Sequence, residues 1–388
     1  MSRKRIHNIV FNDGIDGIVS AALYLYEYVK KDENYILYPV SSFSKGEKFD
    51  TLVKSINLNN NDTLIILDYE YHSKSSLWVN HHYTHKIGED TVLNNKILYD
   101  PKSKSASELM SLVLSDSDKW RKINIKNIIK EVNMIEKSDY PSMESLFTNT
   151  NPLMILRAYI ERSFSSEMML CRIIELIVRN NFNLHDTLIQ LKLDNRVILD
   201  LQKDVEKARN EIVIFGNCSI IRQSRVGKHP RYSEFYLHPE VKYGIRFSRL
   251  SKNRLYFQIG YNKWHIEPNT INICQMISSI KYLIKKGGTY NLGGGILDES
   301  NSERFLDDLS ITLNPEGDIM GISQDEEMEK TAVDPTDPVE KKADEMVKNG
   351  SAVDKDEARE KAAEIPIPTI GNPPVIDFGD EECESDAG

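Results

Sequence analysis

The chain has 388 residues, 40% of them hydrophobic, and a formal net charge of −10. Length and hydrophobic content support two domains with their own cores. No apolar stretch approaches the roughly 18–20 residues needed to cross a bilayer, and no secretory segment is evident, so a cytoplasmic protein without a membrane partner is expected.

The negative charge is concentrated near the C-terminus. Residues 324–388 contain 20 acidic and 7 basic residues, whereas residues 1–323 contain 39 acidic and 42 basic residues. The slightly basic remainder permits a phosphate-bearing ligand without demonstrating one. The acidic, proline-containing segment 324–388 is predicted to be a disordered tail. Its apolar and acidic residues 375–382 suit docking to a basic protein partner; a purely solubilising tail is the alternative.

The chain begins with an expected strand, turn and helix. Residues 6–11 are apolar enough for a strand, and residues 18–30 have helical spacing. Between them, the turn at residues 12–17 carries Asp13 and Asp16 together with two glycines, which permit a tight turn. A carboxylate-rich turn at the carboxyl end of a strand suits a divalent cation. An Asp/Gly turn that caps the helix is the alternative.

Further strands are expected at residues 35–40, 63–68 and 96–100, with helices at 47–58, 105–114 and 122–138. Ser105 is expected to cap the second of these helices. This alternation predicts a doubly wound, mostly parallel α/β domain over residues 1–150.

An acidic residue and a histidine cluster stand out within this domain. Asp68 ends an apolar run of the kind found in buried parallel strands. Three of the nine histidines fall within residues 81–85. Imidazoles beside a carboxylate at the end of such a strand are suitable metal ligands. A solvated polar loop is the alternative.

The second half divides into two segments. Residues 151–210 have helical periodicity and are expected to form a helical connector. Residues 211–323 are expected to form a smaller α/β substrate-binding domain, with strands at 212–221, 243–250 and 255–261 and a helix at 271–285. Five glycines within residues 287–295 would let backbone N–H groups face an anion; a flexible hairpin is the alternative.

Taken in order, these stretches resemble the DHH phosphoesterase superfamily, which includes RecJ-type exonucleases and oligoribonucleases. The turn at residues 12–17 resembles the first motif, and Asp68 resembles the second. Asn80-His81-His82 lies where the family has Asp-His-His, and Asp139 resembles the fourth motif. Arg246-Phe247-Ser248 and the glycines of 287–295 resemble motifs of the DHH-associated substrate domain.

The resemblance implies a metal-dependent phosphodiesterase or exonuclease acting on single-stranded nucleic acid, oligonucleotides or small nucleotides. Two Mn²⁺ or Mg²⁺ ions are implied, with Asp68 as the bridging ligand and His82 beside the scissile phosphate. The implied metal ligands are Asp13, Asp16, Asp68, His81 and Asp139. The implied substrate-binding residues are Ser105, Arg246, Ser248, Gly287, Gly288, Gly293 and Gly294.

Three positions depart from the family pattern. Phe11 stands where the family has a metal-binding histidine, unless Asp13 substitutes for it; Asn80 replaces an aspartate; and Thr289 replaces the histidine of the glycine loop. Replacing a residue that hydrogen-bonds to a metal ligand typically lowers metal affinity or activity by about 10–100-fold, and loss of a ligand itself should lower it further. A catalytically weakened relative that binds nucleotide or nucleic acid and recruits a partner is therefore the alternative.

Overall fold

The computed structural model describes residues 4–30, 33–41, 47–82, 97–114, 120, 123, 125–162, 166–224, 229–251 and 253–313. The predicted acidic tail and His85 lie outside these residues. The described residues form two compact units, divided between Asp204 and Val205, and each unit has its own sheet. The predicted domain boundaries at residues 150 and 210 stay predictions.

The first unit is built on a five-stranded sheet. Its strands are β1 (Ile6–Asn12), β2 (Asn34–Val40), β3 (Thr63–Leu67), β4 (Leu77–Asn80) and β5 (Ile97–Tyr99). All neighbouring strands are parallel, in the order β2-β1-β3-β4-β5. The chain thus leaves β1 toward one edge and returns to build the other, which creates a topological switch point between β1 and β3.

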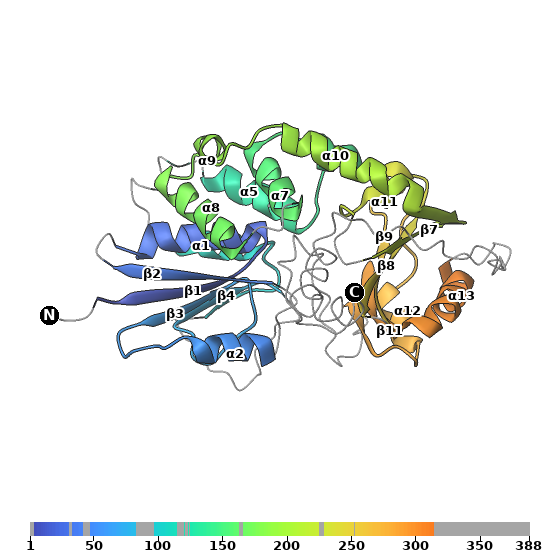
Figure 1. The fold of residues 1–388 in the computed structure, drawn as a ribbon, viewed down its shortest axis with the longest axis horizontal. Helices are drawn as coiled ribbons and strands as arrows, with labels where there is room; N and C mark the ends of the chain where they lie inside the picture. Colours follow the sequence, from blue (N-terminus) through green and yellow to red (C-terminus); the bar gives the residue numbers. More distant parts are fainter. Residues whose placement is uncertain are drawn as a thin grey trace, which may run out of the picture. The chain divides into compact units, whose positions relative to one another are not determined.

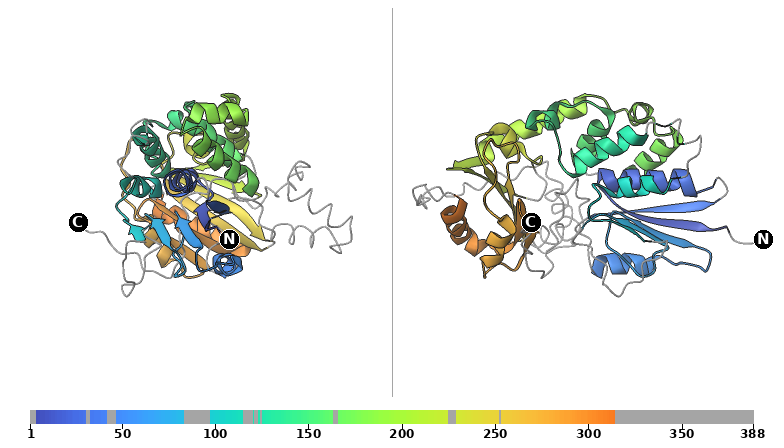
Figure 2. Two further views of the ribbon diagram at one scale, coloured as in Figure 1. Left: turned by 90° about the vertical axis from the view of Figure 1, so that its left-hand side faces the viewer. Right: turned by 180° about the vertical axis from the view of Figure 1, so that it is seen from behind.

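Helices cover both faces of this sheet, as Figures 1 and 2 show. Helix α1 (Ile15–Tyr28) covers one face, and α2 (Glu47–Ser55) covers the other. Phe49 and Val53 of α2 are buried against Ile66 and Trp78. The predicted doubly wound α/β fold is therefore confirmed.

The described residues between β5 and the second sheet include helices α3 (Ala106–Leu112), α5 (Ile125–Glu136), α6 (Met143–Thr148), α7 (Pro152–Arg162), α8 (Glu167–Arg179), α9 (Leu184–Leu191) and α10 (Arg196–Ala208). The helices predicted for residues 151–210 are present. Helix α8 packs against α1 and β2, and the division between the two units falls within α10. The predicted connector stays a prediction.

The second unit has a mixed six-stranded sheet in the order β10-β11-β9-β8-β7-β6, in which only β7 and β8 pair in parallel. Phe247, Phe257 and Phe305 lie at the centre of its core. Its elements are η2 (Arg209–Glu211), β6 (Ile212–Phe215), β7 (Cys218–Gln223), α11 (Ser233–Leu237), β8 (Tyr243–Ser251), β9 (Arg254–Tyr261), α12 (Ile273–Ser279), β10 (Lys285–Thr289), β11 (Leu292–Asp298), η3 (Glu299–Asn301) and α13 (Ser302–Leu313).

Two predicted elements of this unit were wrong in extent. The strand expected at residues 212–221 is two antiparallel strands, because Gly216 adopts a φ of 52° and reverses the chain. The helix expected at residues 271–285 ends at Ser279, and Lys285 already begins β10. The helix stops because Ile280, the next residue, already has an extended backbone with φ −82° and ψ 112°.

The glycine-rich stretch after this helix is a hairpin rather than an open loop. Strands β10 and β11 pair Gly287 with Gly294 and Gly288 with Gly293. Gly288 has a φ of 157°, and a Cβ there would lie 2.3 Å from the Leu292 carbonyl oxygen. The hairpin alternative from the sequence is therefore the observed conformation.

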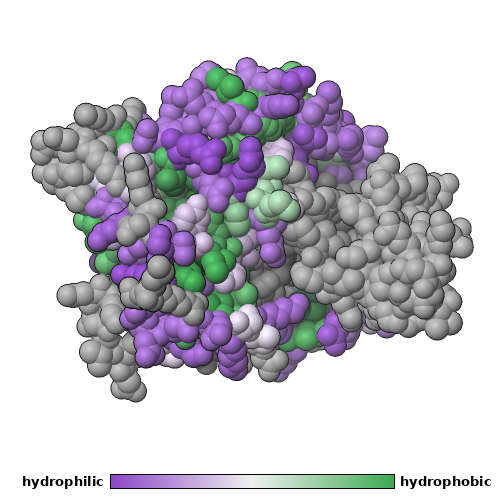
Figure 3. All heavy atoms as spheres, turned by 60° about the vertical axis from the view of Figure 1, so that its left-hand side comes forward, coloured by the Kyte–Doolittle hydropathy of each residue, from purple (hydrophilic) through white to green (hydrophobic). Residues whose placement is uncertain are grey.

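No helix in the described part of the chain is both long and apolar enough to cross a membrane. Hydrophobic and hydrophilic side chains are interspersed over the face shown in Figure 3. Strongly exposed apolar residues such as Leu112 and Met168 lie on different helices, α3 and α8. Single exposed residues of this kind are ordinary for a globular surface.

Replacement of Gly295 by alanine should destabilise the second unit. Its added Cβ would lie 2.2 Å from the Lys285 carbonyl oxygen and 2.7 Å from the Phe257 ring. Overpacking of this kind costs about 1–3 kcal/mol, which urea denaturation would measure. Gly260→Ala is the matched control, because the nearest atom there lies at an ordinary 3.4 Å. Equal unfolding midpoints for the two variants would contradict the prediction.

Candidate active site

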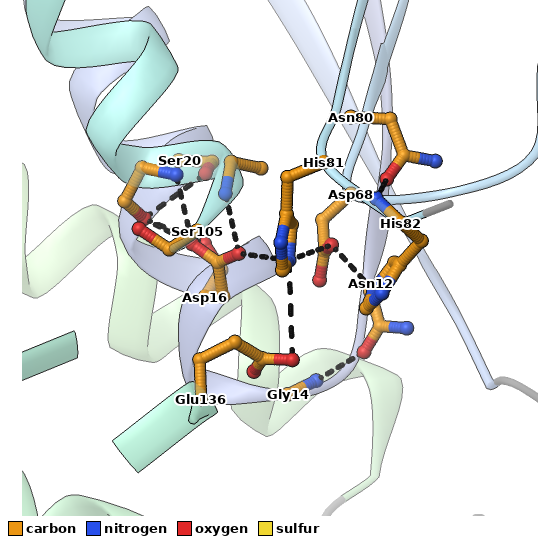
Figure 4. A network of polar contacts seen from close by, with 12 residues as sticks. Asn12, Gly14, Asp16, Ser20, Asp68, Asn80, His81, His82, Ser105 and Glu136 are labelled. Atoms are coloured by element: carbon orange, nitrogen blue, oxygen red, sulfur yellow. Dashed lines mark hydrogen bonds and ion pairs between the residues drawn. The ribbon is translucent and has the colours of Figure 1, made fainter. Parts of the chain in front are cut away.

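The candidate site lies where β1, β3 and β4 end. Because these strands are parallel, their carboxyl ends meet at one edge of the sheet. The turn after β1, Asp68 after β3, and His81 and His82 after β4 therefore come together (Figure 4).

Asp68, His81 and His82 form a compact group whose possible ligand atoms all lie within 4.8 Å of one another. The Asp68 Oδ1 atom is 3.1 Å from His82 Nε2 and 3.6 Å from His81 Nε2. His81 Nε2 also lies 3.5 Å from Asp16 Oδ2 and 3.9 Å from Glu136 Oε1. Three carboxylates and two imidazoles thus face one small volume.

Asp68 reaches this volume through an unusual backbone conformation. It follows β3 directly and has a φ of 54°, while its N–H donates to the Val79 carbonyl oxygen at 2.8 Å. Aspartate tolerates the left-handed region better than most residues. This turn out of the strand directs the carboxylate toward both histidines.

Asp16 is held by the start of helix α3. Its Oδ2 accepts a hydrogen bond from the Ala106 N–H at 2.7 Å, and its Oδ1 accepts from the Ser107 N–H at 2.8 Å and the Ser107 hydroxyl at 2.6 Å. The Ser20 and Ser107 hydroxyls are 3.0 Å apart. Burial raises the pKa of Asp16, whereas these hydrogen bonds from Ser107 and Ala106 lower it. Asp16 is therefore both part of the site and the anchor of α3.

Asn80 positions the histidine pair. The His82 N–H donates to Asn80 Oδ1 at 2.9 Å, so asparagine supplies here the acceptor oxygen that an aspartate would also offer. Its Nδ2 group donates to the Tyr69 carbonyl oxygen at 2.8 Å, and the Trp78 indole N–H donates to the same oxygen. An ionised aspartate could not donate to Tyr69, so asparagine fits this environment.

The turn after β1 is tightly built. Asn12 Oδ1 accepts a hydrogen bond from the Gly14 N–H at 2.8 Å, and a Cβ at Gly17 would lie 2.1 Å from the Asn12 carbonyl oxygen. Phe11, at the position of the family's histidine, is fully buried in the core. Its side chain carries no ligand atom, so it contributes nothing to metal binding.

Asp13 and Asp139, two predicted metal ligands, lie outside the group of Asp68, His81 and His82. Asp13 is buried, and burial raises its pKa to about 7. Asp139 is exposed and lies three residues beyond Glu136, the last residue of α5. A ligand role for either residue stays a prediction.

Glu136 was missed by the sequence reasoning. It is the last residue of α5 and directs its carboxylate toward His81 (Figure 4). The available signal was its position three residues before Asp139, on the same predicted helix end. The sequence predicts a helix at residues 122–138 but does not fix its last turn. It therefore cannot show whether the carboxylate of Glu136 or that of Asp139 faces the sheet.

Ser105 is buried and caps α3, as expected. Its hydroxyl accepts a hydrogen bond from the Glu108 N–H at 3.0 Å and donates to Asn133 Oδ1 at 2.5 Å. Its predicted contact with substrate stays a prediction.

In the second unit, the predicted substrate-binding residues make internal contacts. The Arg246 guanidinium is buried and forms a bidentate ion pair with Glu234 of α11. It also donates to the His229 and Pro230 carbonyl oxygens at 3.3 and 2.8 Å. The Ser248 hydroxyl accepts from Gln223 at 3.1 Å. A phosphate contact by Arg246 or Ser248 stays a prediction, as does one by the hairpin glycines Gly287, Gly288, Gly293 and Gly294.

Comparison with known proteins identifies the class of fold. The chain is structurally similar to DHH-family phosphoesterases over about four-fifths of its length. One similar structure is the pGpG-specific phosphodiesterase PggH from Vibrio cholerae, with a TM-score of 0.55 and 13% identity. It covers 81% of this chain and 100% of its own.

Two further structures are more distant. RecJ from Thermus thermophilus in complex with Mn²⁺ has a TM-score of 0.46 and 11% identity over 81% of this chain and 53% of its own. CDC45 from Entamoeba histolytica has a TM-score of 0.38 and 8% identity over 79% of this chain and 94% of its own. No protein-family model and no curated protein sequence matches the chain.

Replacement of Asn80 by aspartate, which restores the family residue, should destabilise this protein. The ionised side chain of the Asn80→Asp variant would place a carboxylate against the Tyr69 carbonyl oxygen in a fully buried position. The expected loss is about 1–3 kcal/mol at pH 7, and it should shrink toward pH 5 as the carboxyl becomes protonated. Urea denaturation at both pH values measures it.

Asn291→Asp is the control for this prediction, because Asn291 is exposed and uses its Oδ1 as an acceptor for Asn269, a role that a carboxylate keeps. Equal losses for both variants at pH 7 would contradict the account of Asn80.

Proposed function

We propose that this protein is a metal-dependent phosphodiesterase that hydrolyses phosphodiester bonds of single-stranded nucleic acid, short oligonucleotides or small nucleotides. The observation that carries the proposal is the convergence of Asp68, His81 and His82 at the switch point of a parallel sheet, with Asp16 and Glu136 facing His81.

The donor set suits Mn²⁺ or Mg²⁺. Ligand atoms bonded to one such ion at about 2.1 Å lie roughly 3–4 Å apart, and His81 Nε2 lies 3.5, 3.6 and 3.9 Å from the oxygens of Asp16, Asp68 and Glu136. Mixed carboxylate and imidazole ligands are typical of Mn²⁺ sites. When bound, two such ions would supply a hydroxide near neutral pH and neutralise charge on the phosphoryl oxygens.

The chain's own residues would divide the remaining work. Asp68 is the central carboxylate, because its Oδ1 atom lies within 3.6 Å of the Nε2 atoms of both histidines, and the family resemblance gives it the role of holding both ions. His82 is partly exposed, and in its protonated form it would place positive charge beside a phosphate. Asn80 accepts a hydrogen bond from the His82 N–H, and Asp16 accepts one from the Ala106 N–H in the first turn of α3. These contacts would keep His82 and Asp16 in position during the reaction.

The shared fold supports a nucleotide substrate. PggH, which has this fold, is a pGpG-specific phosphodiesterase. A linear dinucleotide lies within the proposed substrate class of short oligonucleotides. The slightly basic composition of residues 1–323 also favours a phosphate-bearing ligand.

A catalytically weakened nucleotide-binding protein is the second candidate. Phe11 is buried in the core where the family has a metal-binding histidine, so the site has one potential ligand fewer. Arg246, the expected phosphate contact, is already paired with Glu234. The missing histidine favours binding with reduced turnover over efficient hydrolysis, whereas the pairing of Arg246 removes an expected phosphate contact from either candidate.

Hydrolysis should depend on Mn²⁺ and on Asp68. We expect turnover of at least one substrate among 5′-labelled oligonucleotides, dinucleotides, cyclic dinucleotides and pyrophosphate. Asp68→Ala should lower it by more than about 100-fold, since a central metal ligand is lost. Chromatography of the products measures both. Turnover that stays at the Asp68→Ala background on every substrate would contradict the enzyme and favour the weakened relative.

Glu136 should contribute more to metal binding than Asp139. Glu136→Gln removes a carboxylate that lies 3.9 Å from His81 Nε2 and is expected to weaken Mn²⁺ binding by about 10–100-fold. Asp139→Asn is the matched control on the exposed side of the same segment and should change affinity little. Calorimetric Mn²⁺ titration compares the two. A larger effect at Asp139 would return the ligand role to the residue that the resemblance implies.

A further inference from the structure

One loop of the second unit is held in place by hydrogen bonds at both of its ends. Residues 262–270 lie between β9 and α12. At the first end, Asn262 Nδ2 donates to the Val241 carbonyl oxygen at 2.9 Å, and at the other, Asn269 Nδ2 donates to Asn291 Oδ1 at 2.7 Å. The loop is thus tied to the chain before β8 and to the tip of the β10–β11 hairpin. Bracing of this kind fixes a loop before a ligand binds.

The braced loop carries an isoleucine into solvent. Ile266 is 95% exposed. The residue after it is held by Tyr261, whose hydroxyl donates to the Glu267 carbonyl oxygen at 2.5 Å, and His265 Nε2 before it lies 3.2 Å from the Glu240 carbonyl oxygen. Contacts on both sides therefore keep Ile266 out of the core. An apolar side chain fixed in water is stabilised when a ligand covers it.

Trp264 lies two residues before Ile266 on the same loop. It is partly exposed, whereas Trp78 and Trp120 are buried. Its ring centre lies 5.7 Å from that of Tyr232, with 79° between the ring planes, and the Lys263 ammonium lies 5.0 Å from its ring centre. An indole at the surface beside an ammonium offers both a ring on which a base stacks and a cation for the adjoining phosphate.

Tyr232 supports this tryptophan from a strained position. It precedes α11 and has a φ of 63°, which is rare for a bulky side chain and costs free energy. Its ring lies 6.3 Å from the buried Phe235 ring, with 25° between the planes, and so joins the surface tryptophan to the core. Strain of this kind is frequent at ligand-binding sites, where it fixes side chains before the ligand arrives.

The charge and position of the loop suit a phosphate-bearing polymer. The loop contains Lys263 and Glu267, and the Glu267 carboxylate is paired with Lys242 at 3.2 Å. Two lysines and one acid leave a positive balance beside Trp264. The hairpin to which the loop is bonded through Asn291 also carries the glycines that resemble a substrate motif.

We propose that Trp264, together with Tyr232, Lys263 and Ile266, forms a base-stacking site for single-stranded nucleic acid. The inference rests on the proposed function, because it takes the ligand to be nucleic acid. It adds a binding surface that the family resemblance did not supply. Within the proposed substrate class it favours nucleic acid chains, because stacking on aromatic side chains accepts every base and extends along a strand.

The test measures binding by the full chain without Mn²⁺, so that the probes stay intact. The probes are fluorescein-labelled oligothymidylate and oligouridylate of about 12 nucleotides, and an abasic strand of the same length. We expect the wild type to bind at least one base-carrying strand more tightly than the abasic strand. Trp264→Ala should lower that affinity by about 5–150-fold, the equivalent of one stacked base. Its affinity for the abasic strand should change little.

Tryptophan fluorescence tests whether the indole itself contacts the bases. Since Trp78 and Trp120 are 0% and 6% exposed, a base stacked on the protein should quench Trp264. The quenching should persist in Trp120→Phe and disappear in Trp264→Phe. A merely structural role for Trp264 would leave its emission unchanged when the base-carrying strand binds.

Ile266 provides a second variant if Trp264→Ala does not fold. Because its side chain is almost fully exposed, Ile266→Ala should melt at the wild-type temperature and still weaken binding of the base-carrying strand by about 5-fold. Ile311→Ala is the matched control, since Ile311 is 67% exposed on α13 of the same unit. It should leave binding unchanged.

Each contrary result has a distinct meaning. Equal affinity of the wild type for base-carrying and abasic strands overturns the inference, as does binding that neither Trp264→Ala nor Ile266→Ala weakens. Tight binding with loss in these variants but no hydrolysis keeps the inference and contradicts the proposed enzyme. If the wild type neither binds nor hydrolyses any strand or nucleotide, both fail together.

Discussion

The Asp16 carboxylate is the contact on which the first unit's site depends. It lies in the first turn of α1 and accepts two backbone N–H groups and one hydroxyl from the first turn of α3. Two helix N-termini thus converge on one buried negative charge, and each stabilises it electrostatically. Because Asp16 Oδ2 also lies 3.5 Å from His81, the same charge links the packing of two helices to the position of an imidazole.

Polar residues that resemble family motifs have different surroundings in the two units. In the first unit, acids and imidazoles that are far apart in the sequence converge on one volume at the end of a parallel sheet. In the second, the arginine and serine that resembled a substrate motif pair with Glu234 and Gln223. Carboxylates and imidazoles gathered at one place suit a metal, whereas a buried arginine that is already paired suits packing.

Local signals predicted the parts of the site that follow directly from strand ends. Asp68 and the acidic turn after β1 were found because an apolar run before a carboxylate is visible in the sequence. Strand β4 was not recognised, although Trp78 and Val79 are fully buried, because its four residues merge into a polar stretch. The Arg246–Glu234 pair was also invisible, since it depends on how the short helix α11 packs on β8. The sequence also could not show which of Glu136 and Asp139 faces the histidines, because that depends on the residue at which α5 ends.

The unequal burial of the two histidines has a consequence for access. The His81 side chain is 2% exposed, and the His82 side chain is 25% exposed, although their ring centres are only 4.2 Å apart. The group therefore has an inner and an outer imidazole. Solvent therefore reaches the group from the His82 side, and the His81 side chain is shielded behind it.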